Sequence, residues 1–236
     1  MKPYIFIFLF LYIAPCSAIE VSGELTGDQV WSVRESPVHV TATVRIPAGS
    51  SIKIEPGVTV IFDDYYALQV YGVIEATGTE KQPVLFTALR KVPDKPGWQG
   101  LVLYGEKCKA ILSDCIIENS FKNMCWKTSP LIRSSTFRQN TYGFYCSNTK
   151  SAMIMKCKFT DNTYGIYCDF STPTIQGNII ARNDFGIYCI FSSAPLVGLN
   201  ILQDNTTKDI FLDDSMGKNE ITVRNQYIWS LVRDIF

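Results

Sequence analysis

The chain has 236 residues, 47% of them hydrophobic and 19% charged, so it has enough apolar surface for a core and its composition excludes a disordered chain. Lys plus Arg and Asp plus Glu number 22 each, and the formal net charge is +0. A neutral chain without a basic run lacks the phosphate-neutralising surface that drives nucleic-acid binding. We therefore expect no nucleic-acid partner.

The first 18 residues are typical of a cleavable signal peptide. Lys2 supplies the positive charge, an apolar run covers 4–14, and Cys16 and Ala18 place small residues before a cleavage site after Ala18. The run is shorter than the roughly 20 apolar residues that span a bilayer. Lipidation of Cys16 is an alternative that Pro15 makes a poor fit. We predict a secreted, periplasmic or cell-surface protein with no transmembrane segment in the mature chain.

Residues 19–105 are predicted to form the first coils of a solenoid. Short segments at 44–47, 51–54, 58–62, 68–74 and 84–87 alternate apolar and polar residues, as strands with one buried face do. Turn signals at 47–49 and 55–57 separate them, each with proline and glycine. No stretch has a helical period.

Residues 106–212 repeat every 21–22 residues, and the repeat is clearest in an asparagine column. Its members are Asn119, Asn140, Asn162, Asn183 and Asn205. With these in register, apolar residues align at two earlier positions, and Gly143, Gly165 and Gly186 align three positions later. A residue type that recurs once per coil predicts parallel strands stacked about 4.8 Å apart. The asparagines are then expected to form an internal amide ladder at a turn.

The runs IPAGSSIKIEPGVTVIF, ALQVYGVIEATGTEKQPVLFTA and GWQGLVLYG, followed by rows such as NTYGIYC, resemble bacterial secreted right-handed parallel β-helix proteins of pectate-lyase-like architecture. The resemblance covers about residues 36–212 and implies an all-β, single-stranded right-handed parallel β-helix of about nine coils. It implies no single activity, because such proteins include lyases, epimerases and adhesins. We expect one domain, 19–236, in which 213–236 resembles the segment that often closes such helices.

Four cysteines form a second column, at Cys125, Cys146, Cys168 and Cys189. They lie two residues after inward apolar positions, so their thiols are expected in the core. Buried cysteine behaves as a small hydrophobe. Neighbours at the strand spacing also fall within the Cα range of disulfides, and thiolates can bind soft metals, although a linear stack does not give tetrahedral geometry. All three alternatives remain open at this point.

Aromatic residues form two outward columns on either side of an inward one. The first contains Tyr145, Tyr167 and Tyr188, and the second contains Tyr142, Tyr164 and Phe185. Stacked outward aromatics suit the apolar faces of sugar rings, and they also stabilise a sheet by packing on one another. We treat these six residues as the candidate binding site for a glycan or an envelope protein.

Candidate catalytic groups are few. Asp161, Asp184 and Asp204 lie within one residue of the asparagine column and form a loose acidic cluster at one turn. They are either solvated turn residues or a site for calcium or a uronate; otherwise we expect no metal and no cofactor. The only histidine, His39, lies in the first coils and is interpreted as a surface or cap residue.

These observations favour an exported, non-catalytic protein that presents a rigid sheet face to a glycan or a protein of the cell envelope. A polysaccharide-active enzyme of the uronate lyase or epimerase kind and a purely structural envelope component are the alternatives. Because the ends of a β-helix can pair with other chains unless they are capped, self-association is also possible on this interpretation.

Overall fold

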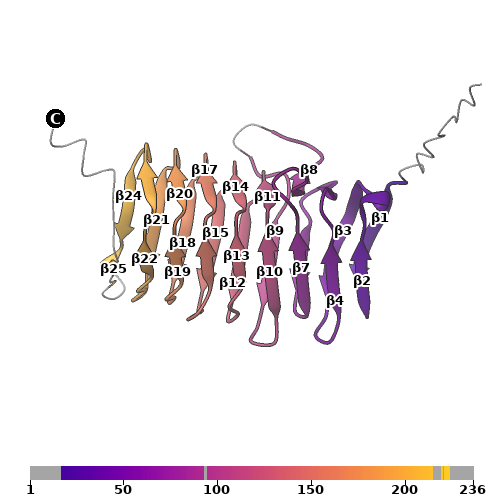
Figure 1. Ribbon diagram of the computed structural model, residues 1–236, viewed down its shortest axis with the longest axis horizontal. Helices are drawn as coiled ribbons and strands as arrows, with labels where there is room; N and C mark the ends of the chain where they lie inside the picture. Colours follow the sequence, from indigo (N-terminus) through magenta and orange to yellow (C-terminus); the bar gives the residue numbers. More distant parts are fainter. Residues whose placement is uncertain (1–16, 93–94, 215–218, 220, 224–236) are drawn as a thin grey trace, which may run out of the picture.

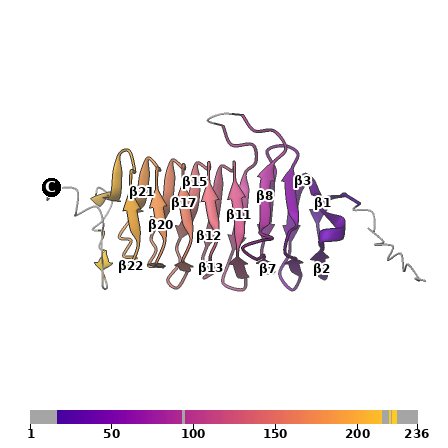
Figure 2. The same cartoon turned by 45° about the horizontal axis from the view of Figure 1, so that its top comes forward.

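The computed structural model describes residues 17–92, 95–214, 219 and 221–223. Residues 1–16 of the predicted signal peptide, 1–18, and most of the predicted closing segment, 213–236, therefore lie outside the described residues. The described chain winds into a solenoid whose coils follow one another along the long axis of the molecule (Figures 1 and 2). Every pairing between strands is parallel, as the fixed-period repeat predicts.

The strands line up in three faces. The first contains β6 (Ala67–Val70), β9 (Gly100–Tyr104), β12 (Lys122–Trp126), β15 (Tyr142–Ser147), β18 (Tyr164–Asp169), β21 (Phe185–Ile190) and β24 (Lys208–Leu212). The second contains β5 (Thr59–Phe62), β8 (Val84–Ala88), β11 (Cys115–Glu118), β14 (Thr136–Arg138), β17 (Lys158–Thr160), β20 (Ile179–Ala181) and β23 (Ile201–Gln203). Successive strands of one face are neighbours in space although a whole coil separates them in sequence.

The third face is a nine-stranded sheet of β2 (Asp28–Trp31), β4 (Ser51–Ile54), β7 (Val73–Thr77), β10 (Lys109–Ser113), β13 (Leu131–Arg133), β16 (Met153–Met155), β19 (Thr174–Gln176), β22 (Leu196–Gly198) and β25 (Thr222–Val223). The long strand β3 (Val38–Ile46) pairs with both β5 and β6, so it joins the first two faces, and β1 (Ile19–Glu24) pairs with β3. A single 3₁₀ turn, η1 (Val33–Glu35), follows β2. Among the described residues, no helix is long and apolar enough to cross a membrane.

Alternation along each strand fills the interior with columns of like residues. Phe137, Phe159 and Ile180 lie directly above one another on the second face and are fully buried. The glycine column is also explained by packing: a Cβ on Gly165 would lie 2.6 Å from the carbonyl oxygen of Gly186 on the next coil. A side chain at this position would therefore force adjacent coils apart.

Polar ladders satisfy the backbone at the three corners. At the corner between the second and first faces, which we call the asparagine corner, Asn140 Oδ1 accepts from the Ser120 N–H at 2.9 Å, and Asn162 and Asn183 repeat this contact one coil later each time. Each of the other two corners has a similar ladder of side chains. One contains Thr149, Ser171 and Ser193, and the other contains Ser135, Asn178 and Asn200. Each ladder supplies hydrogen bonds that the bent backbone cannot make to itself.

The prediction that Asn119 begins the asparagine ladder is wrong by one residue. Ser120 holds that position, because the coil from Ser120 to Asn140 has 20 residues whereas the next have 22 and 21. Asn119 instead has a left-handed backbone, with φ of 60°, and shares this conformation with Gln139 and Asp161 in the column before the ladder. Equal spacing of asparagines therefore concealed a shorter coil.

Candidate functional site

The two predicted aromatic columns lie on the outside of the first face. Tyr145, Tyr167 and Tyr188 stack with ring centroids 4.7 and 5.0 Å apart, and Tyr142, Tyr164 and Phe185 stack at 4.9 and 5.3 Å. All six are half-buried. The parallel strands β15, β18 and β21 place them because identical positions of successive coils pair in register. Sequence reasoning missed Phe211, which extends the first column by stacking on Tyr188 at 4.8 Å.

The packing of these rings limits what can bind to them. Besides its parallel neighbours, Tyr167 has the perpendicular rings of Tyr142 and Tyr164 of the other column against it, at 5.4 and 5.2 Å. These neighbours cover much of each ring face and leave edges and hydroxyl groups toward solvent. At the β12 end, the Lys122 ammonium lies 4.8 Å from the Tyr145 ring centroid and 5.1 Å from that of Tyr142. The columns therefore offer hydroxyls and edges more readily than open faces.

Burial also holds the column tyrosines in their neutral form. Desolvation, together with a hydrogen bond of 2.9 Å that the Tyr145 hydroxyl donates to Asp169, raises the pKa of Tyr145 far above its usual value. Desolvation and the neighbouring tyrosines raise the pKa of Tyr167 in the same direction. Their hydroxyls are thus hydrogen-bonding groups rather than nucleophiles over the physiological range.

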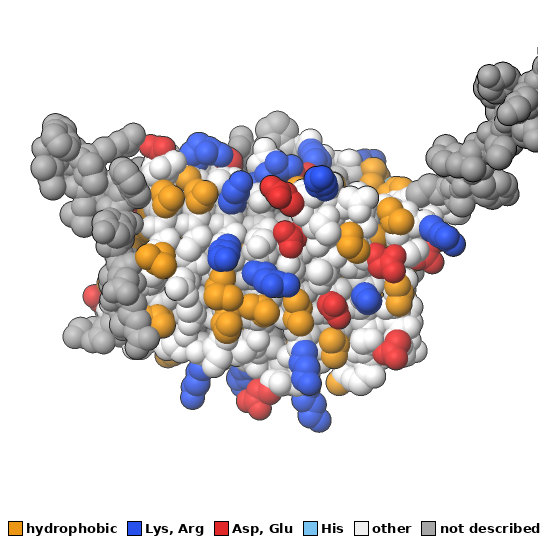
Figure 3. Space-filling view, in the orientation of Figure 1, with side chains coloured by type: hydrophobic (Ala, Val, Ile, Leu, Met, Phe, Trp, Pro, Cys, Tyr) orange, Lys and Arg blue, Asp and Glu red, His pale blue; other side chains and the backbone are white. Residues whose placement is uncertain are grey.

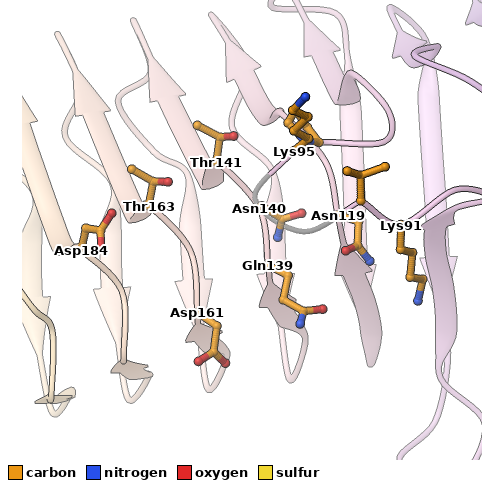
Figure 4. Close-up of a pocket in the computed structure, with 11 residues that line it drawn as sticks. Lys91, Lys95, Asn119, Gln139, Asn140, Thr141, Asp161, Thr163 and Asp184 are labelled. Atoms are coloured by element: carbon orange, nitrogen blue, oxygen red, sulfur yellow. The ribbon is translucent and has the colours of Figure 1, made fainter.

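A groove of about 730 Å³ adjoins the columns at the asparagine corner (Figure 4). Its outer wall comes from the loop after β8, through Lys91, Val92, Lys95 and Pro96. Its floor comes from consecutive coils, and Figure 4 shows Thr141, Thr163 and Asp184 in succession along it. The remaining lining residues are Asn119, Gln139, Asn140 and Asp161. Loops that project from a rigid scaffold commonly carry binding sites.

A buried carboxylate fastens this loop to the body of the solenoid. Glu118 is 2% exposed and accepts hydrogen bonds from Thr87 Oγ1 at 2.8 Å, Lys91 Nζ at 2.5 Å and Arg138 Nε at 2.8 Å. Burial alone would raise the pKa of Glu118, and these hydrogen bonds more than offset burial and lower it. The Trp98 indole N–H donates to the Glu118 carbonyl at 2.8 Å, which holds the other end of the loop. Sequence reasoning did not single out Glu118, Lys91 or Arg138.

The predicted acidic cluster is divided among two columns. Asp161 and Asp184 line the groove, and Asp204 shares the left-handed conformation of Asp161 two coils further on. Arg182 Nε and Nη2 each donate to Asp161 at 2.9 Å, and this pairing lowers the pKa of Asp161. In the parts of the chain that the structure describes, no group of three or more His, Cys, Asp or Glu side chains is arranged to hold a metal ion.

The cysteine column lies in the core of the first face. Cys125, Cys146, Cys168 and Cys189 are in register, completely buried, and present as free thiols. Contacts with the thiols of Cys125 and Cys168, together with burial, raise the pKa of Cys146 well above its usual value. All four thiols are closed off from solvent, so in this structure they fill the core.

His39 lies at the opposite end of the molecule from the groove's acidic residues, on β3. Its Nδ1 is 2.8 Å from Asp63 Oδ1, and both side chains are partly exposed. The pair joins two adjacent coils and shares no lining residue with the groove.

The comparisons with known proteins agree with this architecture. Residues 94–228 match the family described as the right handed beta helix region, and residues 23–113 match the pectate-lyase like beta helix domain. No curated protein and no solved structure matches the chain. The first match spans more than half of the 236 residues, and together the two matches cover the nine stacked strands of the third face from β2 to β25. The chain belongs to the right-handed parallel β-helix family.

Proposed function

We propose that this protein is an exported, non-catalytic binding protein whose ligand is an extended glycan lying in the groove at the asparagine corner. The observation that carries the proposal is the continuity of the groove with the aromatic columns. Thr141 and Thr163 line the groove, and the next residues in the chain, Tyr142 and Tyr164, belong to the second aromatic column. A ligand along the groove would therefore contact polar floor groups and aromatic rim together.

The floor supplies the chemistry that sugar hydroxyls require. Among the described residues, the side chains of Gln139, Thr141 and Thr163 make no hydrogen bond to protein, so their donors and acceptors are available. Thr141 and Thr163 occupy equivalent positions of consecutive coils, about 4.8 Å apart, which suits a ligand that is itself a repeating chain. Tyrosine edges and hydroxyls at the rim add contacts of the kind common in sugar and protein recognition.

Support for binding rather than turnover comes from the state of the carboxylates. Glycoside hydrolysis commonly uses a pair of accessible carboxyl groups on either side of the scissile bond. Glu118 is buried beneath Lys91 and Arg138, and Asp161 is paired with Arg182 through both oxygens. The predicted signal peptide supports export to a compartment where envelope glycans are found.

The experiment is a glycan-array screen of residues 19–236, repeated with the double variant Thr141→Val/Thr163→Val. Valine keeps the shape of threonine and removes its hydroxyl, so two hydrogen bonds worth about 1 kcal/mol each would be lost and affinity would fall about 10- to 30-fold. Thr136→Val/Thr174→Val is the matched control, because both threonines are half-exposed on the other two faces. Absence of binding by the wild type, or unchanged binding by the groove variant, would overturn the proposal.

A further inference from the structure

The groove that we propose as the glycan site carries opposite charges at its two ends. Beneath the loop, Lys91 and Arg138 both pair with one carboxylate, Glu118, and Lys95 of the same loop also lines the groove. Because Glu118 is 2% exposed whereas the Lys91 and Arg138 side chains are 55% and 46% exposed, the solvent side of this end is positive. A ligand approaching from solvent meets the cations first.

The same end contains a hydrogen-bond donor without a partner. Asn119 Nδ2 is buried and makes no hydrogen bond among the described residues, although Asn119 lines the groove. A buried amide donor left without an acceptor costs about 1–3 kcal/mol, so such groups usually have a partner. An acceptor oxygen of a ligand, such as a carboxylate or sulfate oxygen held by the nearby lysines, would supply it.

The opposite end is acidic. Asp161, Asp184 and Asp204 belong to successive coils of the asparagine corner, and Arg182 pairs with Asp161. Asp184 lies on the groove floor, where its Oδ1 accepts from Thr206 Oγ1 at 3.1 Å. Among the described residues Asp184 forms no ion pair, whereas Asp161 is paired with Arg182, so Asp184 is the acidic group best placed to meet a ligand.

The two ends are separated by a fixed distance along the solenoid axis. Thr141, Thr163 and Asp184 occupy equivalent positions of consecutive coils, and the loop lysines overhang the coil before Thr141 (Figure 4). Three steps at the strand spacing give about 14 Å between the positive end and Asp184. In the space-filling view, basic and acidic side chains are interspersed over the visible face rather than separated (Figure 3).

We propose that the groove selects a zwitterionic glycan, with an acidic group bound beneath the loop by Lys95 and Asn119 and a free ammonium group bound about three coils away by Asp184. This inference rests on the proposed function of the groove. A polyanion would meet like charge at the acidic end and a polycation at the loop end, and like-charge contacts provide specificity by repulsion. A neutral glycan would leave both ends without an ionic partner.

The test compares two oligosaccharides of the same backbone by titration calorimetry with residues 19–236. One alternates glucuronate with glucosamine, and the other carries N-acetylglucosamine in place of glucosamine and so lacks the ammonium groups. We expect the zwitterionic form to bind at least 10-fold more tightly at low salt, and the difference to shrink at high salt as screening increases. Equal affinity of the two forms would overturn the inference.

Variants distinguish the two ends. Asp184→Asn is expected to abolish the preference for the free amine while leaving the affinity for the N-acetylated form within two-fold. Lys95→Gln is expected to weaken both forms, because both carry carboxylates. Glu80→Gln, an exposed carboxylate outside the groove, is the matched control and should change neither. If no glycan of any charge binds, the proposed function itself fails. If glycans bind with the same affinity whatever their charge, and Asp184→Asn changes nothing, only the preference for a zwitterionic glycan is contradicted.

Discussion

Glu118 is the residue on which the geometry of the groove depends. Its carboxylate is buried, and three side chains from β8, the loop and β14 donate to it. Replacing it with glutamine removes the charge that holds Lys91 and Arg138. Breaking a buried ion pair typically costs about 3–5 kcal/mol, and since both cations here can reach water we expect Glu118→Gln to lower the free energy of unfolding by about 2–3 kcal/mol.

The pH dependence of this loss has a definite sign. The pKa of Glu118 is lowered in the folded protein, so its contribution to stability is present above the unfolded pKa of about 4.3 and disappears as pH falls through the folded value. Urea unfolding of wild type and Glu118→Gln should therefore differ at neutral pH and converge in acid. Glu106→Gln, an exposed carboxylate, is the control. A difference that persists at low pH would contradict the ionic role of Glu118.

At the level of elements, the asparagine ladder links consecutive coils through buried side-chain amides. Asn183 is fully buried, accepts from the Asn162 N–H at 3.1 Å and donates to the Phe159 carbonyl at 3.0 Å. Asn183→Ala leaves both backbone groups without partners, and we expect a loss of about 2–4 kcal/mol in unfolding free energy. The exposed amide of Gln176, replaced by alanine on β19, should cost less than about 0.5 kcal/mol. Equal urea midpoints for the two variants would show that the ladder contributes nothing.

The aromatic columns predict an unusual alkaline titration. Desolvation raises the pKa of Tyr142, Tyr145, Tyr167 and Tyr188, so their neutral form is favoured in the folded protein. Stability that these residues contribute is present below the unfolded pKa of about 10 and is lost as pH rises through the higher folded values. Tyrosinate absorbance should therefore appear in a late step that accompanies unfolding. If Tyr167→Phe leaves the size of that step unchanged, the late step does not come from the column.

The repeat predicted from the sequence is accurate where each coil keeps the same length and inaccurate where it does not. From Asn140 to Asn205, the steps of 22, 21 and 22 residues fix which side chains face inward, because inward and outward positions alternate strictly. The series fails one coil earlier. There a serine, Ser120, occupies the ladder position, and the coil from it to Asn140 is shorter than the later ones. The periodic pattern alone could not show this, since Asn119 stands next to Ser120 in the sequence.

The groove was less predictable than the fold because a loop outside the repeat forms it. Glu118 occupies an outward position, in register with Arg138 on the next coil, and is buried only because the loop crosses above it. Nothing in the period of the repeat indicates where Lys91 returns to the body. The loop does interrupt the regular repeat. Phe86 and Ile117 pair in register on adjacent coils, yet more residues separate them than separate the equivalent pairs of later coils. An extra-long coil with Pro and Lys residues could have marked the loop as a candidate binding element.

At the scale of the whole molecule, stability is distributed along a one-dimensional stack in which each coil contacts its neighbours. Terminal coils of such stacks open more readily than central ones. The buried thiols report this gradient. Cys189 lies on β21, which is next to the last described strand of its face, β24, whereas Cys125 and Cys146 lie on strands nearer the middle of the stack. Burial raises the pKa of Cys108 to about 11 and those of Cys115 and Cys157 to about 12, so reaction of any of them requires opening of the coil.

We therefore expect alkylation of residues 19–236 at about pH 8, below the usual cysteine pKa of about 8.5, to be negligible in the native state. In urea below the unfolding midpoint, Cys189 should react before Cys168, and Cys168 before Cys146, as peptide-level mass spectrometry would show. Reaction in full denaturant, where the sites should differ little, is the control. Simultaneous reaction of all sites would mean that the solenoid opens as one cooperative unit. Thiols that stay unreactive even in denaturant, until a reductant is added, would instead show that the column forms disulfides between adjacent coils.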